Sequence, residues 1–146
     1  MSDLEAGLRA WSHLLGAHAL AIRAVEGRLK AAGMPPLGWY DVLIELERAG
    51  GRLRIGEIGE RVVIEPYNMT RLVDRLSKQG LLTRERAEDD GRGALIALTP
   101  QGAELRRQMW PHYRRAIEQS FADALDQSDA EAVVHAMKKV IAKLRS

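Results

Sequence analysis

The chain has 146 residues and a formal net charge of +2 at neutral pH, and 46% of its residues are hydrophobic. This length and composition indicate one globular protomer over residues 1–146 and exclude a disordered chain. The absence of cysteine excludes disulfides, cysteine-based zinc sites and thiol redox sensing within these residues. No apolar run approaches the roughly 20 residues of a membrane span, and the acidic start lacks the basic region of a secretory signal. We therefore expect a cytoplasmic protein that does not bind membranes.

A long amphipathic helix is predicted at the start of the chain, over residues 3–32. Its large residues recur in alternating steps of four and three: Leu4, Leu8, Trp11, Leu15, His18, Ile22, Val25 and Leu29. Helices that pack side by side show this spacing, and a stripe of this length requires partner helices to cover it. Gly33 and two prolines then end the helix.

Two short helices are predicted next, and Leu53–Arg54 could form a very short strand between them. The first helix carries Trp39, Leu43 and Leu46 on one face and ends at a pair of glycines, as helices commonly do. The second helix covers residues 56–62.

A fourth helix follows a tight turn, and Pro66 is expected at its first position because proline is pre-organised there. Residues at helical spacing form its buried stripe: Met69, Leu72, Val73 and Leu76. Gly80 is expected to end it. Two strand-like runs, residues 81–86 and 94–99, flank a polar loop and predict a β-hairpin with a long tip.

Two further helices are predicted to complete the chain. Thr99 and Pro100 begin the fifth helix, and Pro111 is expected to kink it or break it locally. Its large residues recur every four positions: Leu105, Met109, Tyr113, Ile117, Phe121 and Leu125. A capping box at Ser128–Glu131 predicts the start of the last helix. The predicted fold is therefore mainly α with a small β-hairpin.

The exposed face of the fourth helix carries hydrogen-bonding and basic side chains. Opposite the buried stripe lie Tyr67, Asn68, Thr70, Arg71, Asp74, Arg75 and Lys78. A recognition helix presents its N-terminal residues to base edges in the major groove, where arginine suits guanine and asparagine suits adenine. Taken alone, this face fits a solvated amphipathic helix equally well. Together with the preceding short helix and tight turn, it predicts a helix-turn-helix.

The hairpin that follows predicts a wing beside the helix-turn-helix. Arg92 at its tip can enter a narrow minor groove, where the negative potential is enhanced, and Asp90 can orient the guanidinium. The alternative is an ordinary surface hairpin with a local ion pair, which contributes little. Six basic and five acidic residues lie between Arg71 and Arg92, so DNA binding would depend on where these charges lie.

Five short segments of the chain combine into a specific pattern. They are residues 58–62, 66–76, 78–82, 90–93 and 98–102. Thr-Arg-Leu-Val-Asp-Arg-Leu, a following Lys-Gln-Gly-Leu and an Asp-Gly-Arg tip together resemble the MarR family of bacterial winged helix-turn-helix regulators. The sequence similarity covers roughly residues 37–105, and the order of the predicted helices extends the resemblance to the whole chain.

This resemblance implies a homodimer with a winged helix-turn-helix over residues 52–100 and a helical dimerisation part formed by residues 1–34 and 101–146. It implies a transcription regulator, which we expect to be a repressor, on a pseudo-palindromic site in double-stranded DNA. It also implies that Arg92 enters the minor groove. The DNA-binding candidates are Tyr67, Asn68, Thr70, Arg71, Arg75, Lys78, Arg86, Asp90 and Arg92.

Aromatic and polar residues gather where the predicted helices should meet. The candidates for a ligand site are His13, His18, Trp39, Tyr40, Trp110 and Tyr113. Such a lining suits a small aromatic effector, and the resemblance implies a small molecule that alters DNA affinity from between the two parts. The alternative is that Trp39 and Tyr113 belong to the core and that His18 lies at a subunit contact.

No pattern in the sequence favours an enzyme. His13 and His18 are five residues apart, which is wrong for a helical zinc pair, and no phosphate-binding loop, nucleophile elbow or dinucleotide fingerprint occurs. We therefore expect no catalytic residue, metal or cofactor. The rival function is a dimeric helical adaptor whose winged helix binds protein, which the apolar stripes at both ends of the chain fit equally well.

Overall fold

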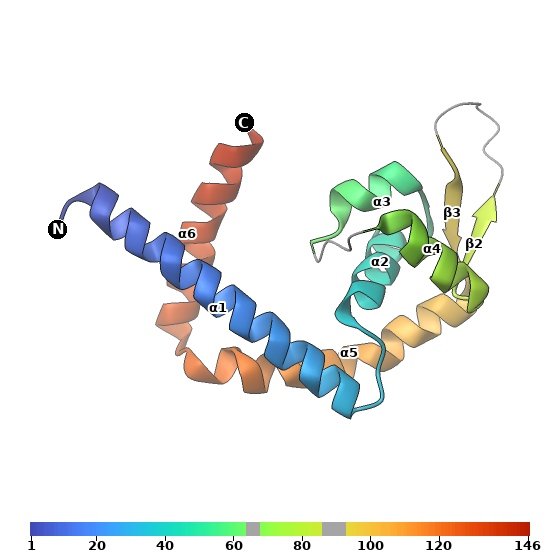
Figure 1. The fold of residues 1–146 in the computed structure, drawn as a ribbon, viewed down its shortest axis with the longest axis horizontal. Helices are drawn as coiled ribbons and strands as arrows, with labels where there is room; N and C mark the ends of the chain where they lie inside the picture. Colours follow the sequence, from blue (N-terminus) through green and yellow to red (C-terminus); the bar gives the residue numbers. More distant parts are fainter. Residues whose placement is uncertain (64–67, 86–92) are drawn as a thin grey trace. The chain divides into compact units, whose positions relative to one another are not determined.

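The computed structural model describes residues 1–63, 68–85 and 93–146. In chain order its elements are α1 (Asp3–Ala31), α2 (Leu37–Arg48), β1 (Arg52–Arg54), α3 (Ile55–Arg61), α4 (Met69–Lys78), β2 (Leu82–Glu85), β3 (Leu95–Leu98), α5 (Pro100–Ser120), the short 3-10 helix η1 (Ala122–Ala124) and α6 (Gln127–Arg145) (Figure 1). The prediction of a mainly helical fold with a small β-hairpin is confirmed. Among the helices described, none is both long and apolar enough to cross a membrane.

The strands form one antiparallel sheet in the order β1-β3-β2. Leu53 of β1 and Arg84 of β2 both pair with Ile96 of β3, from opposite sides. The predicted hairpin is therefore β2 and β3, and the short predicted strand at Leu53–Arg54 joins it as the third strand. Ile96 is buried at the centre of the sheet.

The chain divides into two compact units. The terminal unit contains residues 1–25 and 114–146, and the central unit contains residues 26–113. In the central unit, α2, α3, α4 and the sheet share one apolar core. Its buried members are Val42, Leu43, Leu46, Leu53, Ile58, Val73, Leu76, Leu81, Leu82 and Ile96.

The terminal unit leaves large apolar side chains exposed on α1 and α6. They are Leu4, Leu8, Trp11, Leu14, Leu15, Leu20, Val133, Val134, Val140, Ile141 and Leu144. The predicted α1 stripe is thus buried only toward its C-terminal end, at Val25 and Leu29.

The junction between α4, β2 and α5 is tightly packed. Gly80 follows α4 with a φ of +77°, the left-handed backbone for which glycine is favoured. The Thr99 hydroxyl donates to the Gly80 carbonyl oxygen at 2.7 Å and accepts the Gly102 N–H at 3.0 Å. A Cβ added at Gly102 would lie 2.2 Å from the Leu81 carbonyl oxygen. These contacts fix the base of the hairpin against α4 and α5.

The structure corrects the predicted limits of the last two helices. α5 ends at Ser120, so Phe121 and Leu125 of its predicted stripe lie beyond it. The helix does not break at Pro111, which is exposed, so the carbonyl that loses its partner can bond to water instead.

The cap of α6 also lies earlier than predicted. Asp126 accepts the Asp129 N–H at 2.8 Å and donates its own N–H to the Asp129 carboxylate at 3.2 Å. This reciprocal pair is a capping box, and it replaces the one predicted at Ser128–Glu131.

Candidate nucleic-acid interface

The recognition-helix candidate α4 begins at Met69, and the predicted start at Pro66 is wrong. Asn68 has an extended backbone with a φ of −146°, and its side-chain oxygen accepts the Arg71 N–H at 3.0 Å. This is an N-cap, which satisfies one of the free N–H groups at a helix start. A bidentate contact with adenine uses both the oxygen and the nitrogen of the amide, so in a capping Asn68 the oxygen would have to accept a second hydrogen bond through its other lone pair.

The two faces of α4 have opposite character. Val73 and Leu76 are fully buried, and Met69 and Leu72 pack against the same core, so the predicted buried stripe is confirmed. The other face exposes four of the predicted DNA-binding residues: Thr70, Arg71, Arg75 and Lys78. The remaining DNA-binding candidates, Tyr67, Arg86, Asp90 and Arg92, lie outside the described residues.

Three cations form a row along the exposed face of α4, at helical spacings of four and three residues. Arg71, Arg75 and Lys78, which we call the basic stripe, line a shallow surface hollow together with Asp74 and Gln79. Within residues 1–63, 68–85 and 93–146, no ion pair involves any of the three. Their charges therefore remain available to an external anion such as a phosphate group.

The carboxylate within this hollow has a partner of its own. Asp74 forms a hydrogen-bonded ion pair with Arg84 of β2, so its negative charge is offset by a cation beside α4. The pair also links the helix to the strand. Sequence reasoning did not assign this role to Arg84, because strand alternation would place it on the side of the buried Leu82, whereas the structure leaves Arg84 exposed.

A second ion pair crosses the sheet from β1 to the last residue of β2, toward the loop end of the hairpin. The Arg52 Nε lies 2.9 Å from a Glu85 carboxylate oxygen. The hydrogen bond from Arg52, with the attraction of its charge, holds the pKa of Glu85 below its ordinary value. Arg54 of the same strand donates to the Gly93 carbonyl oxygen at 3.4 Å. Both side chains tie β1 to the hairpin.

The turn after α3 is tethered by a carboxylate that the sequence analysis did not single out. Asp41 of α2 is buried, and its Oδ2 accepts the N–H of Val63 at 2.8 Å. An acidic residue between a buried tyrosine and a buried valine is the signal that could have identified it, since buried charges normally have assigned partners.

The predicted ligand-site residues do not all come together. Tyr40, Trp110 and Tyr113 form an aromatic cluster with ring centroids 5.0 to 6.1 Å apart, in the stacked and edge-to-face arrangements that such rings prefer. Burial and the nearby charge of Asp41 raise the pKa of Tyr113. Trp39 instead packs against the core, as the alternative interpretation expected.

The two histidines proposed for the ligand site belong to the terminal unit. His13 and His18 are both exposed, and a ring nitrogen of His13 lies 2.8 Å from the Arg9 carbonyl oxygen of its own helix. Among the described residues, no group of three or more histidine, aspartate or glutamate side chains is placed to hold a metal ion.

Comparison with known proteins identifies one family. A model of the MarR family matches residues 32–93. The organic hydroperoxide resistance transcriptional regulator of Bacillus subtilis is 39% identical over 54 residues, which are 37% of this chain and 37% of that protein. The first curated relatives are matched over at most 62% of their own length.

Solved structures match nearly the whole chain. AbsC, a MarR family transcriptional regulator from Streptomyces coelicolor, is 27% identical with a TM-score of 0.78, over 99% of this chain and 97% of that chain. Sco3205, a MarR family transcriptional regulator from the same organism solved in complex with DNA, is 26% identical with a TM-score of 0.81. That match covers 99% of this chain and 93% of that chain.

Proposed function

This chain belongs to the MarR family, and on that premise we propose that it is a DNA-binding transcription regulator that acts as a homodimer. The observation that carries the proposal is the basic stripe on α4, whose three cations are exposed and form no ion pair with the residues described. The opposite face of α4 is anchored in the core. The helix can therefore present these side chains to a duplex without losing packing.

The position of each side chain along α4 suggests its role. Thr70 and Arg71 lie in the first turn, the part of a recognition helix that reaches base edges. Arg75 and Lys78 lie in the last turn and would bind phosphate groups as the helix leaves the groove. Tyr67 and Arg86 are proposed as flanking contacts, and the loop with Asp90 and Arg92 as the minor-groove contact.

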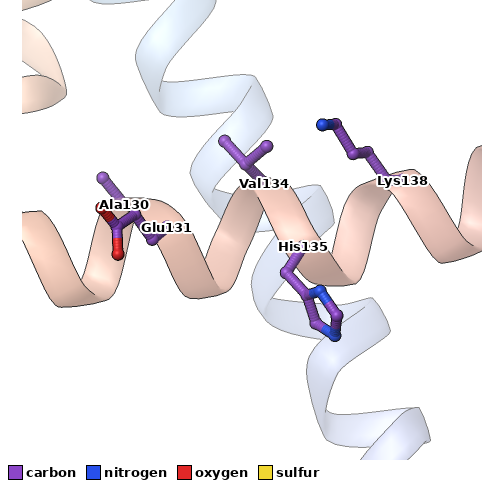
Figure 2. Close-up of a pocket in the computed structure, with 5 residues that line it drawn as sticks. All are labelled: Ala130, Glu131, Val134, His135 and Lys138. Carbon is purple, nitrogen blue, oxygen red and sulfur yellow. The ribbon is translucent and has the colours of Figure 1, made fainter.

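The exposed apolar side chains of the terminal unit support the homodimer. A second copy of the chain could cover the stripe that Leu8, Trp11 and Leu15 form on α1, since large uncovered apolar surfaces mark interfaces. Figure 2 shows a shallow hollow on α6 whose lining residues all come from that one helix, with Val134 and Lys138 on the same side. Two-fold symmetry would place the two copies of α4 about 34 Å apart, one turn of DNA.

The aromatic cluster supports modulation by a small aromatic ligand. Trp110 is 39% exposed beside the buried Tyr40, so a planar molecule could stack on a ring that is partly open to solvent. We propose that such a ligand changes the affinity for DNA and that the protein represses transcription in the cytoplasm, where it meets its operator.

The proposal is tested with the duplex that the wild-type chain selects from a randomised pool. Arg71→Ala removes the arginine proposed to read a guanine and should cost about 1–3 kcal/mol of binding free energy. Arg107→Ala removes the same charge from an arginine that already pairs with Glu104, and it should bind like wild type. Equal affinities for all variants in an anisotropy titration would refute the role of α4.

The same titrations distinguish the adaptor function. A DNA-binding protein loses affinity steeply as salt rises, because bound cations release counterions from phosphates. An affinity for random duplex that is weak and independent of salt would favour a protein partner instead. Arg92→Ala should weaken DNA binding with little change in sequence preference, and wild-type affinity in that variant would remove the wing from the proposal.

A further inference from the structure

A buried carboxylate lies at the point where the chain passes from α3 toward α4. Asp41 on α2 is 8% exposed, and its Oδ2 accepts the backbone N–H of Val63 at 2.8 Å. Val63 comes two residues after the end of α3, in the turn of the helix-turn-helix. The contact therefore joins α2, a helix outside the motif, to the turn inside it.

The turn is held at this point by its backbone and not by side-chain packing. The Val63 side chain is 83% exposed, so it contributes little to the core. The Val62 N–H still bonds to Ile58 within α3, at 3.0 Å. The Val63 N–H leaves that pattern and bonds to Asp41 instead.

The hydrogen bond between the Val63 N–H and the Asp41 carboxylate is of the charge-assisted class, which is stronger than a bond between neutral groups. A carboxylate that accepts a backbone N–H forms a charge-assisted bond, and loss of a partner from a buried charge is costly. The bond therefore restricts where the chain can leave α3. Because only a short segment separates Val63 from the N-cap Asn68, the start of α4 depends on that position.

We propose that Asp41 is a positioning residue for DNA binding: its carboxylate fixes the turn so that the first turn of α4 meets base edges in the correct orientation. The inference rests on the proposed function. Asp41 itself touches no DNA, and it acts through the Val63 N–H. Removing the bond should lower DNA affinity by more than the accompanying loss of stability explains.

The donor side of the bond can be tested without disturbing the core. Val63→Pro removes the N–H, and Val62 already has the φ of −67° and ψ of 141° that a residue before proline prefers. Val63→Ala keeps the N–H and trims the same exposed side chain, so it is the matched control. We expect Val63→Pro to weaken binding to the selected duplex about tenfold or more, and Val63→Ala to stay within about twofold.

The acceptor side gives an independent comparison. Asp41→Asn keeps an oxygen that can accept the N–H, so it should stay within about threefold of wild type, whereas Asp41→Ala should lose about tenfold or more. Leu29→Ala, a buried change on α1, reports what loss of stability alone does to DNA affinity. Its affinity is compared with that of Asp41→Ala after chemical denaturation has measured both stabilities.

Hydrogen exchange of the wild-type chain completes the test and needs no variant. The Val63 amide should exchange far more slowly than an unprotected amide. The inference is overturned if that amide exchanges freely, if Val63→Pro binds like Val63→Ala, or if Leu29→Ala at equal stability loses as much affinity as Asp41→Ala. Failure of the proposed function would look different, because wild type would then bind neither the selected nor the random duplex.

Discussion

The apolar stripes of the two units have different surroundings. In the central unit Leu43 and Leu46 are fully buried against α3, α4 and the sheet, whereas in the terminal unit Leu8 and Trp11 are 58% and 59% exposed. Both stripes have the spacing of packed helices. The central unit therefore completes its core within one chain, while the terminal unit presents an apolar surface that we assign to a second copy.

Charging the terminal stripe should have the largest effect. Leu8→Glu with Leu15→Glu places two carboxylates on the exposed face of α1, where the proposed partner would have to bury them. We expect a monomer by light scattering and a loss of DNA affinity of about hundredfold or more, because the two half-sites are then bound separately. Ala10→Glu adds a charge off the stripe and should remain dimeric. A dimer that survives the double change would refute this interface.

A core truncation in the central unit should act through stability. Leu43→Ala removes a fully buried side chain and should lower the free energy of unfolding by about 2–5 kcal/mol. The loss should not depend on protein concentration, whereas Leu8→Ala should matter only where association contributes to stability. Chemical denaturation at two protein concentrations checks both. If Leu8→Ala lowered the free energy of unfolding by the same amount at both protein concentrations, the assignment of the α1 stripe to a subunit contact would be contradicted.

The junction of α4, β2 and α5 offers a smaller change within the central unit. Thr99→Ala removes the hydroxyl that caps α5 and bonds to Gly80, and it should cost about 0.5–2 kcal/mol of unfolding free energy. Thr83→Ala removes an exposed hydroxyl from β2 and is the control for the loss of a threonine. Indistinguishable midpoints in the two variants would show that the cap is unimportant.

The smallest effect concerns the ion pair on the sheet. Because Arg52 lowers the pKa of Glu85, the pair stabilises the fold above the ordinary glutamate pKa and this contribution is lost as pH falls through the lowered value. Arg52→Ala should raise the pKa of Glu85, measured by NMR titration of its side chain. The pKa of Glu104, which Arg107 lowers, should not move. An unchanged Glu85 pKa would contradict the pairing.

Local signals in the sequence predicted most of the fold. The spacing of Met69, Leu72, Val73 and Leu76 located the buried face of α4, and glycine marked its end, because both depend on residues close in sequence. Where two local signals competed, the prediction failed. Pro66 suggested an earlier helix start, but Asn68 caps α4, and Asp126 caps α6 before the Ser128 box could.

Contacts between distant residues could not be predicted in this way. Arg84 and Asp74 are ten residues apart, and Asp41 and Val63 are twenty-two apart, so no helical or strand periodicity connects them. Six ligand-site residues were predicted where the helices were expected to meet, and three of them form one cluster: Tyr40, Trp110 and Tyr113. Helical spacing alone did not distinguish Trp39, which packs against the core, from the aromatic residues that form the cluster.

The salt dependence of DNA binding tests whether the exposed face of α4 lies against DNA phosphates. Arg75→Ala with Lys78→Ala removes two charges from α4, and Lys139→Ala with Lys143→Ala removes two from α6. For the α4 variant, the slope of log affinity against log salt concentration should become shallower. The change should be roughly 0.9 for each phosphate group that the variant no longer neutralises. The α6 variant should keep the wild-type slope. An unchanged slope in the α4 variant, or an equal change in both, would contradict the assignment of α4 to DNA.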